Sequence, residues 1–127
     1  MRPSNFPAAG QQGSNAWSAG CTASELVGHA VHVSAAGQVR RAQADDLAKS
    51  RVAGFVSAKA SDTSCVVVSD GVLTGLSALT PGATYYLSDA PGVIATTPGT
   101  QAVVEVGEAL SATELVLRLG EMTNMQA

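Results

Sequence analysis

Apolar and polar residues alternate along much of this chain, beginning about a fifth of the way in. Residues 26–33 read LVGHAVHV and residues 39–43 read VRRAQ. The stretch between these two runs reads SAAGQ and contains a glycine. Two such runs joined by a turn are typical of a β-hairpin. The next stretch, ADDLAKSR at 44–51, predicts a short helical turn capped by Asp45 or Asp46.

A second hairpin is predicted over residues 64–76, SCVVVSDGVLTGL. Asp70 and Gly71 separate its two apolar runs. An Asp-Gly pair supplies the positive φ angles of a type I′ turn between two strands. We therefore expect two paired strands around this turn.

The last predicted hairpin joins AVVEVGEAL, residues 102–110, to ELVLRLG, residues 114–120, through the short turn SAT. Successive side chains of a strand point to opposite faces of its sheet. Leu115 and Leu117 therefore share a core face. Val116 points the other way, between two charged neighbours, which makes it a candidate subunit contact.

Residues 79–99, LTPGATYYLSDAPGVIATTPG, contain both tyrosines and three Pro-Gly pairs. Proline presets φ and glycine accepts a positive φ, as a type II turn requires. The strand between two such corners carries Tyr85 and Tyr86 on opposite faces, so they cannot line one pocket. We expect one ring to cover the core and the other to lie on an outer face, an architectural role in which a tyrosine hydroxyl suits an interface edge.

Eight to ten short strands with turn signals every eight to twelve residues predict an all-β fold, a small barrel or sandwich of antiparallel strands. We expect an extended N-terminal arm over residues 1–25, a β domain over 26–121 and a C-terminal tail over 122–127. The arm is rich in proline and glycine but includes Phe6 and Trp17. Trp17 could plug one end of the barrel, or both aromatic residues could anchor the arm on a neighbouring subunit.

The amino-acid composition and net charge bear on which classes of partner the protein binds. Hydrophobic residues make up 46% of the chain, aromatic residues 4% and charged residues 13%, with a net charge of −3. Such a balance does not favour nucleic acid, which binds basic surfaces. The pair Arg40-Arg41 indicates a solvated or subunit-facing strand.

The sequence contains few signals of the cellular compartment in which the protein is made. No apolar run is long enough to span a membrane, and the start of the chain shows no basic-then-apolar leader pattern. We expect synthesis in a cytoplasm, where Cys21 and Cys65 would remain free thiols, with a disulfide between them as the alternative.

Catalytic and metal-binding patterns are also weak. His29 and His32 are three residues apart on a predicted strand, so they point to opposite faces and cannot readily share a metal ion. Glu105 and Glu108 differ in parity and are a poor acid/base pair. The sequence has neither the phosphate-loop motif nor the Gly-x-Ser-x-Gly motif. We therefore expect no enzyme activity, no cofactor and no metal site.

Three segments carry a resemblance to a known class of proteins. They are GLSALTPGATYYLSDAPGVIATTP at 75–98, VVEVGEALSATELVLRLGE at 103–121 and GHAVHVSAAGQVRRAQADDLAKSRVAGFV at 28–56. The first two resemble the small β domains of tailed-bacteriophage virion proteins, both capsid decoration (cement) proteins and some head or tail fibre domains. The third is similar to the start of the capsid-cement type.

The resemblance implies a non-enzymatic protein that binds the outer surface of a phage capsid and stabilises it. Its location would be the exterior of the virion, after synthesis in the bacterial host. Its partners would be the major capsid protein and other copies of itself, as a homotrimer or alternatively a dimer. A receptor- or glycan-binding fibre module is the alternative function. The candidate partner-binding residues are Phe6, Trp17, Tyr86 and Val116.

Overall fold

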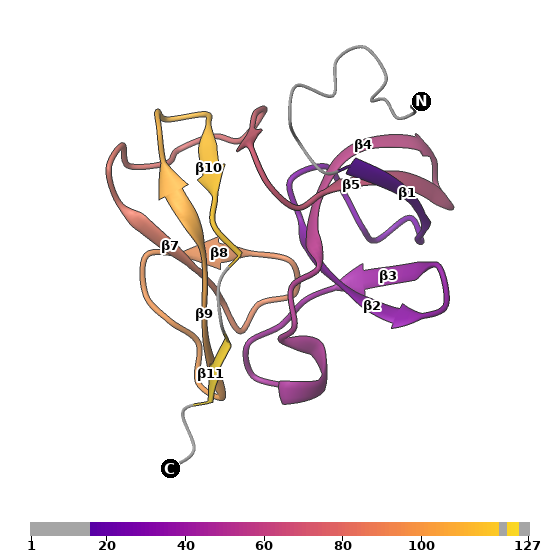
Figure 1. Ribbon diagram of the computed structural model, residues 1–127, viewed down its shortest axis with the longest axis horizontal. Coiled ribbons are helices and arrows are strands. Elements are labelled where there is room, and N and C mark those ends of the chain that lie inside the picture. The colour runs from indigo at the N-terminus through magenta and orange to yellow at the C-terminus, as the bar shows by residue number, and fades with distance from the viewer. Residues whose placement is uncertain (1–15, 120–121, 125–127) are drawn as a thin grey trace, which may run out of the picture.

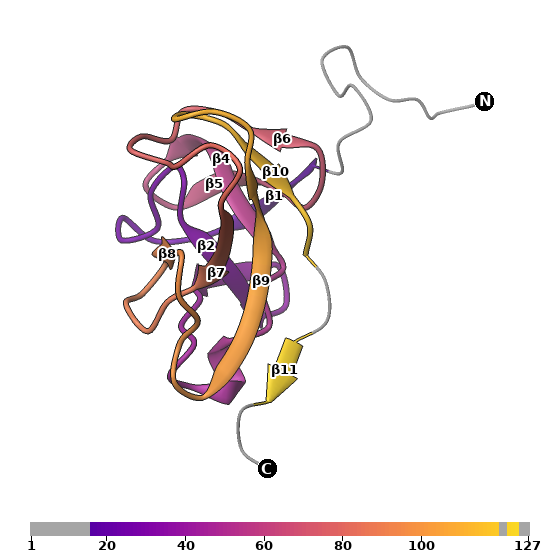
Figure 2. The same ribbon diagram turned by 90° about the vertical axis from the view of Figure 1, so that its left-hand side faces the viewer.

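The computed structural model describes residues 16–119 and 122–124, and it confirms the all-β prediction. Five strands close into a barrel in the order β1-β3-β2-β4-β5, and the remaining strands form a second sheet in the order β6-β10-β9-β7-β8, with β11 paired to β9. Figure 1 shows the barrel and the second sheet side by side. Figure 2 shows the long strand β9, with β10 beside its upper part and β11 beside its lower part. The barrel strands are β1 Ala16–Gly20, β2 Ala30–Ala35, β3 Gln38–Arg41, β4 Gly54–Ser61 and β5 Ser64–Val68. The others are β6 Val72–Leu73, β7 Thr84–Leu87, β8 Ile94–Ala95, β9 Ala102–Ala109, β10 Leu115–Leu117 and β11 Met122–Asn124.

Two of the three hairpins that the sequence predicted are present in the structure. β2 pairs antiparallel with β3, and β9 pairs antiparallel with β10. The predicted helical turn is a single 3-10 turn, Leu47–Lys49, in which the Asp46 side chain accepts a hydrogen bond from the backbone N–H of Ala48 at 2.9 Å. This cap satisfies an N–H that the short turn would otherwise leave unpaired.

The predicted hairpin at 64–76 is wrong. β5 pairs with β4 and β1 inside the barrel, whereas β6 pairs with β10 in the second sheet. Gly71 does adopt a positive φ of 87°, as expected, but Asp70 is not among the residues of positive φ, so the turn is not type I′. Both edges of β5 are occupied by barrel strands, so the chain after Gly71 crosses to the other sheet.

The boundaries of the β domain also differ from the expected ones. Residues 16–20, assigned to the arm, form strand β1, which pairs with β5 along its whole length. Ala19 is buried in the barrel, and a side chain at Gly20 would collide with Gln38. At the other end, the expected tail contributes β11. Phe6 lies outside the described residues.

Two clusters of buried side chains hold the fold together. The first fills the barrel and consists of Ala19, Cys21, Val31, Val39, Val56, Cys65 and Val67. The second joins the barrel to the second sheet. It includes Phe55 of β4, Tyr85 and Leu87 of β7, and Leu115 of β10. The barrel and the sheet therefore share a core.

The tyrosine prediction is confirmed. Tyr85 is buried, and its hydroxyl accepts a hydrogen bond from the backbone N–H of Thr80 at 2.9 Å. Tyr86 is half-buried on the opposite side of β7. Gly82 and Gly92, in the flanking Pro-Gly pairs, adopt φ angles of 83° and 74°, as type II turns require. No helix in the described part of the chain is long and apolar enough to cross a membrane.

Candidate functional site

The second sheet has an outer face on which two predicted partner-binding residues, Tyr86 and Val116, both lie. Across neighbouring strands, Val116 of β10 lies opposite Val72 on one side and Glu108 on the other, and Glu108 lies opposite Thr84 of β7. Tyr86 is two residues along β7 from Thr84, on the same side. We call these five residues the outer sheet face.

The outer sheet face is partly apolar and partly exposed. Val72 is 46% exposed, whereas Tyr86 and Val116 are half-buried. The charge of Glu108 is matched at its edge by Arg118, whose Nη1 lies 3.5 Å from Glu108 Oε1. A sheet face with exposed valine at one edge and a half-buried tyrosine three strands away has a composition suited to a protein contact.

Trp17 does not belong to this face. It lies on β1 of the barrel, opposite Val67 of β5, and it is 37% exposed. Alternation along β1 places Trp17 on the same face as Ala19, which is buried in the barrel, so the partly exposed indole does not join Tyr86 and Val116. The structure separates the predicted partner-binding residues into two locations.

An apolar groove lies between the loop before β2, residues 75–79 that follow β6, and residues 92–94 at the start of β8. Its lining includes Val27, Leu76, Leu79, Val93 and Ile94, and it has a volume of about 350 Å³. Val27 and Val93 are largely exposed. This groove is a second apolar surface, and it shares no residue with the outer sheet face.

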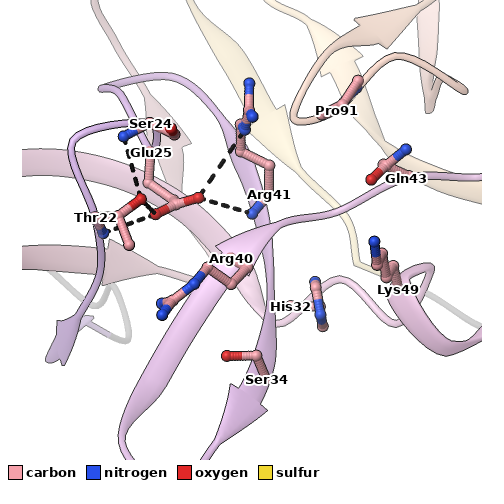
Figure 3. Close-up of a pocket in the computed structure, with 10 residues that line it drawn as sticks. All are labelled: Thr22, Ser24, Glu25, His32, Ser34, Arg40, Arg41, Gln43, Lys49 and Pro91. Atoms are coloured by element: carbon pink, nitrogen blue, oxygen red, sulfur yellow. Dashed lines mark hydrogen bonds and ion pairs between the residues drawn. The ribbon is translucent and has the colours of Figure 1, made fainter.

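A polar pocket of about 350 Å³ lies beside the β2–β3 hairpin (Figure 3). Its charged or titratable lining residues are Glu25, His32, Arg40, Arg41 and Lys49. They come from the loop before β2, from β2 and β3, and from the 3-10 turn. The sequence placed Arg40 and Arg41 on a solvated or subunit-facing strand, and no pattern in it predicted a pocket.

Glu25 is buried at one side of this pocket and is held by several donors. Its Oε1 accepts hydrogen bonds from the backbone N–H of Thr22 at 2.8 Å and from the Thr22 hydroxyl at 2.6 Å. Its Oε2 accepts one from the backbone N–H of Arg41 at 3.3 Å and lies 4.0 Å from Arg41 Nε. The Thr-x-x-Glu spacing of residues 22–25 is that of a capping box, a sequence signal that could have indicated this contact.

These contacts set the protonation of Glu25. Burial, the largest influence, would raise its pKa, but hydrogen bonds from Thr22 and Arg41 and the charge of Arg40 together lower the pKa below its ordinary value. A carboxyl group whose pKa is lower in the folded state stabilises the fold when ionised, and this contribution is lost as the pH falls. At neutral pH the Glu25 charge is therefore present and already engaged.

Lys59 forms a second polar cluster at the barrel end. Its Nζ donates to the backbone carbonyls of Glu25 at 2.7 Å, Thr22 at 2.8 Å and Asp62 at 3.3 Å, and it lies 3.2 Å from Cys21 Sγ. One ammonium group thus ties the loop before β2 to the β4–β5 turn.

Both cysteines are free, as predicted, and both are buried. Burial and the neighbouring Cys21 thiol raise the pKa of Cys65 to about 11. A thiol with such a pKa is protonated at neutral pH and is a weak nucleophile. Cys65 belongs to the buried cluster that fills the barrel, where it packs as a small apolar side chain.

We expect Lys59→Met to lower the free energy of unfolding by about 2 kcal/mol, because three carbonyl groups would each lose one hydrogen-bond donor while the apolar stem is kept. Urea denaturation followed by circular dichroism measures this change. Lys49→Met is the matched control, since Lys49 is exposed and its loss should alter stability by less than about 0.5 kcal/mol. Equal effects of the two substitutions would show that the Lys59 contacts contribute nothing.

His29 and His32 have different environments, but His29 precedes β2 and so does not lie on the strand that was predicted to hold both histidines. His29 Nδ1 accepts a hydrogen bond from the backbone N–H of Leu26 at 3.0 Å. Burial and then the charge of Arg41 lower the pKa of His29, which favours the neutral form that can accept this bond. Within the described residues, no group of three or more histidine, cysteine or acidic side chains is placed to hold a metal ion.

No protein-family model matches the chain, and no curated protein matches it. A function must therefore be inferred from the outer sheet face, the apolar groove and the polar pocket themselves.

Proposed function

We propose that this chain is a structural virion protein that binds the outer surface of a tailed-phage capsid and stabilises it. The observation that carries the proposal is the outer sheet face. It is built from Val72, Thr84, Tyr86, Glu108 and Val116, and all but Val72 belong to the two C-terminal segments that resemble phage decoration domains.

A decoration protein needs surfaces for two kinds of neighbour. One surface must contact the capsid and another must contact further copies of the protein. The outer sheet face and the apolar groove at Val27 and Val93 offer two distinct apolar surfaces. We assign the outer sheet face to the capsid and the groove to neighbouring copies.

We further propose that the protein acts as a homotrimer, with a dimer as the alternative. A small body offers each neighbour only a modest contact, and a standard interface buries roughly 800 Å² on each partner. A closed oligomer presents several weak contacts at once, and the resulting effective concentration raises overall affinity. Native mass spectrometry of the free protein and of protein released from particles distinguishes the two states.

The test of capsid binding is co-sedimentation with undecorated capsids of the phage that encodes the chain. We expect saturable binding by the wild-type protein and at least about a tenfold loss of affinity for Val72→Glu, because a buried unpaired carboxylate is costly at an interface. Val33→Glu is the matched control: Val33 is a valine of the barrel, 58% exposed, outside the outer sheet face.

The outcomes separate the possible functions. Wild-type protein that never sediments with capsids contradicts the proposal. Equal losses from both substitutions would contradict the assignment of the outer sheet face. Saturable glycan binding that Trp17→Ala abolishes, without capsid binding, would support the alternative function as a glycan-binding fibre module.

A further inference from the structure

The polar pocket beside the β2–β3 hairpin has an excess of positive charge that the chain does not neutralise. Arg40, Arg41 and Lys49 all line it, and Glu25 is its one carboxylate. The whole chain, in contrast, has a net charge of −3. The pocket is therefore a local positive site on an acidic protein.

The carboxylate in the pocket cannot balance all three cations. The Glu25 oxygens already accept hydrogen bonds from Thr22 and from the backbone of Arg41. Arg40 donates through Nη1 to the backbone carbonyl of Val39 at 2.8 Å. In the described part of the chain, neither Arg40 nor Lys49 forms an ion pair.

The acidic residues next to the pocket are engaged elsewhere. Asp46 caps the 3-10 turn through the N–H of Ala48. Asp45 Oδ1 accepts a hydrogen bond from Gln43 Nε2 at 3.3 Å, and neither aspartate lines the pocket. Glu25 is thus the counter-charge that Arg40 and Arg41 share, and Lys49 has no ion-pair partner among the described residues.

His32 adds a second, independent observation. It is only 8% exposed, and its Nδ1 has no hydrogen-bond partner among the described residues. His32 lies directly opposite Arg40 in the β2–β3 register, so the two side chains are neighbours on one face. In Figure 3, Lys49 and Gln43 lie to one side of His32 and Arg40 lies to the other. Unpaired buried polar atoms are uncommon and indicate a missing partner.

We propose that this pocket binds an anionic group, a carboxylate or phosphate, through Arg40, Arg41 and Lys49, with His32 in its wall. Guanidinium groups match the paired oxygens of both anions, and an ammonium group adds a point charge. The volume of about 350 Å³ exceeds that of a single small ion, which leaves room for a small organic anion or an acidic side chain. This binding is independent of the proposed virion role.

The test is titration of the ¹⁵N-labelled full chain, at constant ionic strength, with inorganic phosphate in one series and glutarate in another. We expect saturable shifts of backbone amides confined to the β2–β3 hairpin, the loop before it and the 3-10 turn. Arg40→Gln and Lys49→Gln should each weaken binding at least about fivefold, the effect of roughly one surface charge contact. Arg118→Gln makes the same charge change on the second sheet and should leave binding unchanged.

Each outcome of the titrations either supports or overturns the proposed anion-binding site. Saturation by phosphate alone, by glutarate alone or by both supports it and identifies the anion. Non-saturable shifts spread over the surface, or equal weakening by Arg118→Gln, would overturn it. Lys49 is exposed, so Lys49→Gln tests the site even where Arg40→Gln fails to fold.

Discussion

Phe55→Ala is expected to lower the free energy of unfolding by about 3–5 kcal/mol, the cost of removing a large buried side chain and leaving a cavity. Phe55 is the largest fully buried side chain among the described residues, and it is completely inaccessible to solvent. Small domains are stable by only about 5–15 kcal/mol, so this one change should remove a large share of the total. Equilibrium urea denaturation measures it.

The location of Phe55 also leads us to expect that the barrel and the second sheet unfold cooperatively. Phe55 belongs to the barrel, but its cluster includes Leu87 and Leu115 of the second sheet. The barrel and the sheet should therefore unfold in one transition, and the variant should shift the midpoint without changing the slope. Trp17→Ala removes a larger but partly exposed aromatic group and should cost much less. Equal losses, or two separate transitions, would contradict a shared core.

Gly107→Ala is expected to cost about 3 kcal/mol, at the upper end of what overpacking a closely packed site costs. Gly107 lies opposite Leu117 in the β9–β10 pair, and a Cβ there would collide with the backbone oxygen of Val116 and lie 3.2 Å from Leu115 Cγ. Because a backbone atom cannot rotate away as a side chain can, the two strands would have to separate.

Gly82→Ala separates this collision from ordinary glycine effects. Gly82 has a φ of 83°, but a Cβ there would have no neighbouring atom within 4 Å, so only the backbone conformation opposes alanine. That conformation costs about 1 kcal/mol for a residue with a Cβ. Hydrogen exchange should also be faster across β9 and β10 in Gly107→Ala alone. Similar losses of stability in the two variants would contradict the close approach at Gly107.

Short-range patterns were sufficient to predict much of the fold. The β2–β3 and β9–β10 hairpins connect neighbouring strands, and their turns and alternation lie within a single stretch of sequence. The opposite burial of Tyr85 and Tyr86 follows from the same alternation. Parity also predicted that Val116 faces away from the core.

The incorrect predictions concern the choice of strand partners. Residues 64–76 have the local features of a hairpin, yet β5 pairs with β1 and β4 because the closed barrel occupies both of its edges. Strand β1 was missed because five residues, AWSAG, show little periodicity until β5 lies beside them. Strand pairing depends on side chains far apart in sequence, which a local pattern does not contain.

The polar pocket could not be predicted for the same reason. Glu25, Arg41 and Lys49 are separated along the chain, and only the barrel and the 3-10 turn bring them together. The Thr-x-x-Glu spacing of residues 22–25 is typical of the start of a helix, and no helix begins there in the structure. The Lys59 contacts likewise join the loop before β2 to a turn that begins after residue 61.

The most direct test of the proposed function is a cryo-EM map of capsids decorated with the full chain. We predict density for the barrel and the second sheet on the outside of the shell, grouped around a three-fold axis. The outer sheet face, with Val72, Tyr86 and Val116, should contact the capsid surface. A map of saturated particles in which this body is missing from the shell, or in which the outer sheet face points to solvent, would contradict the account.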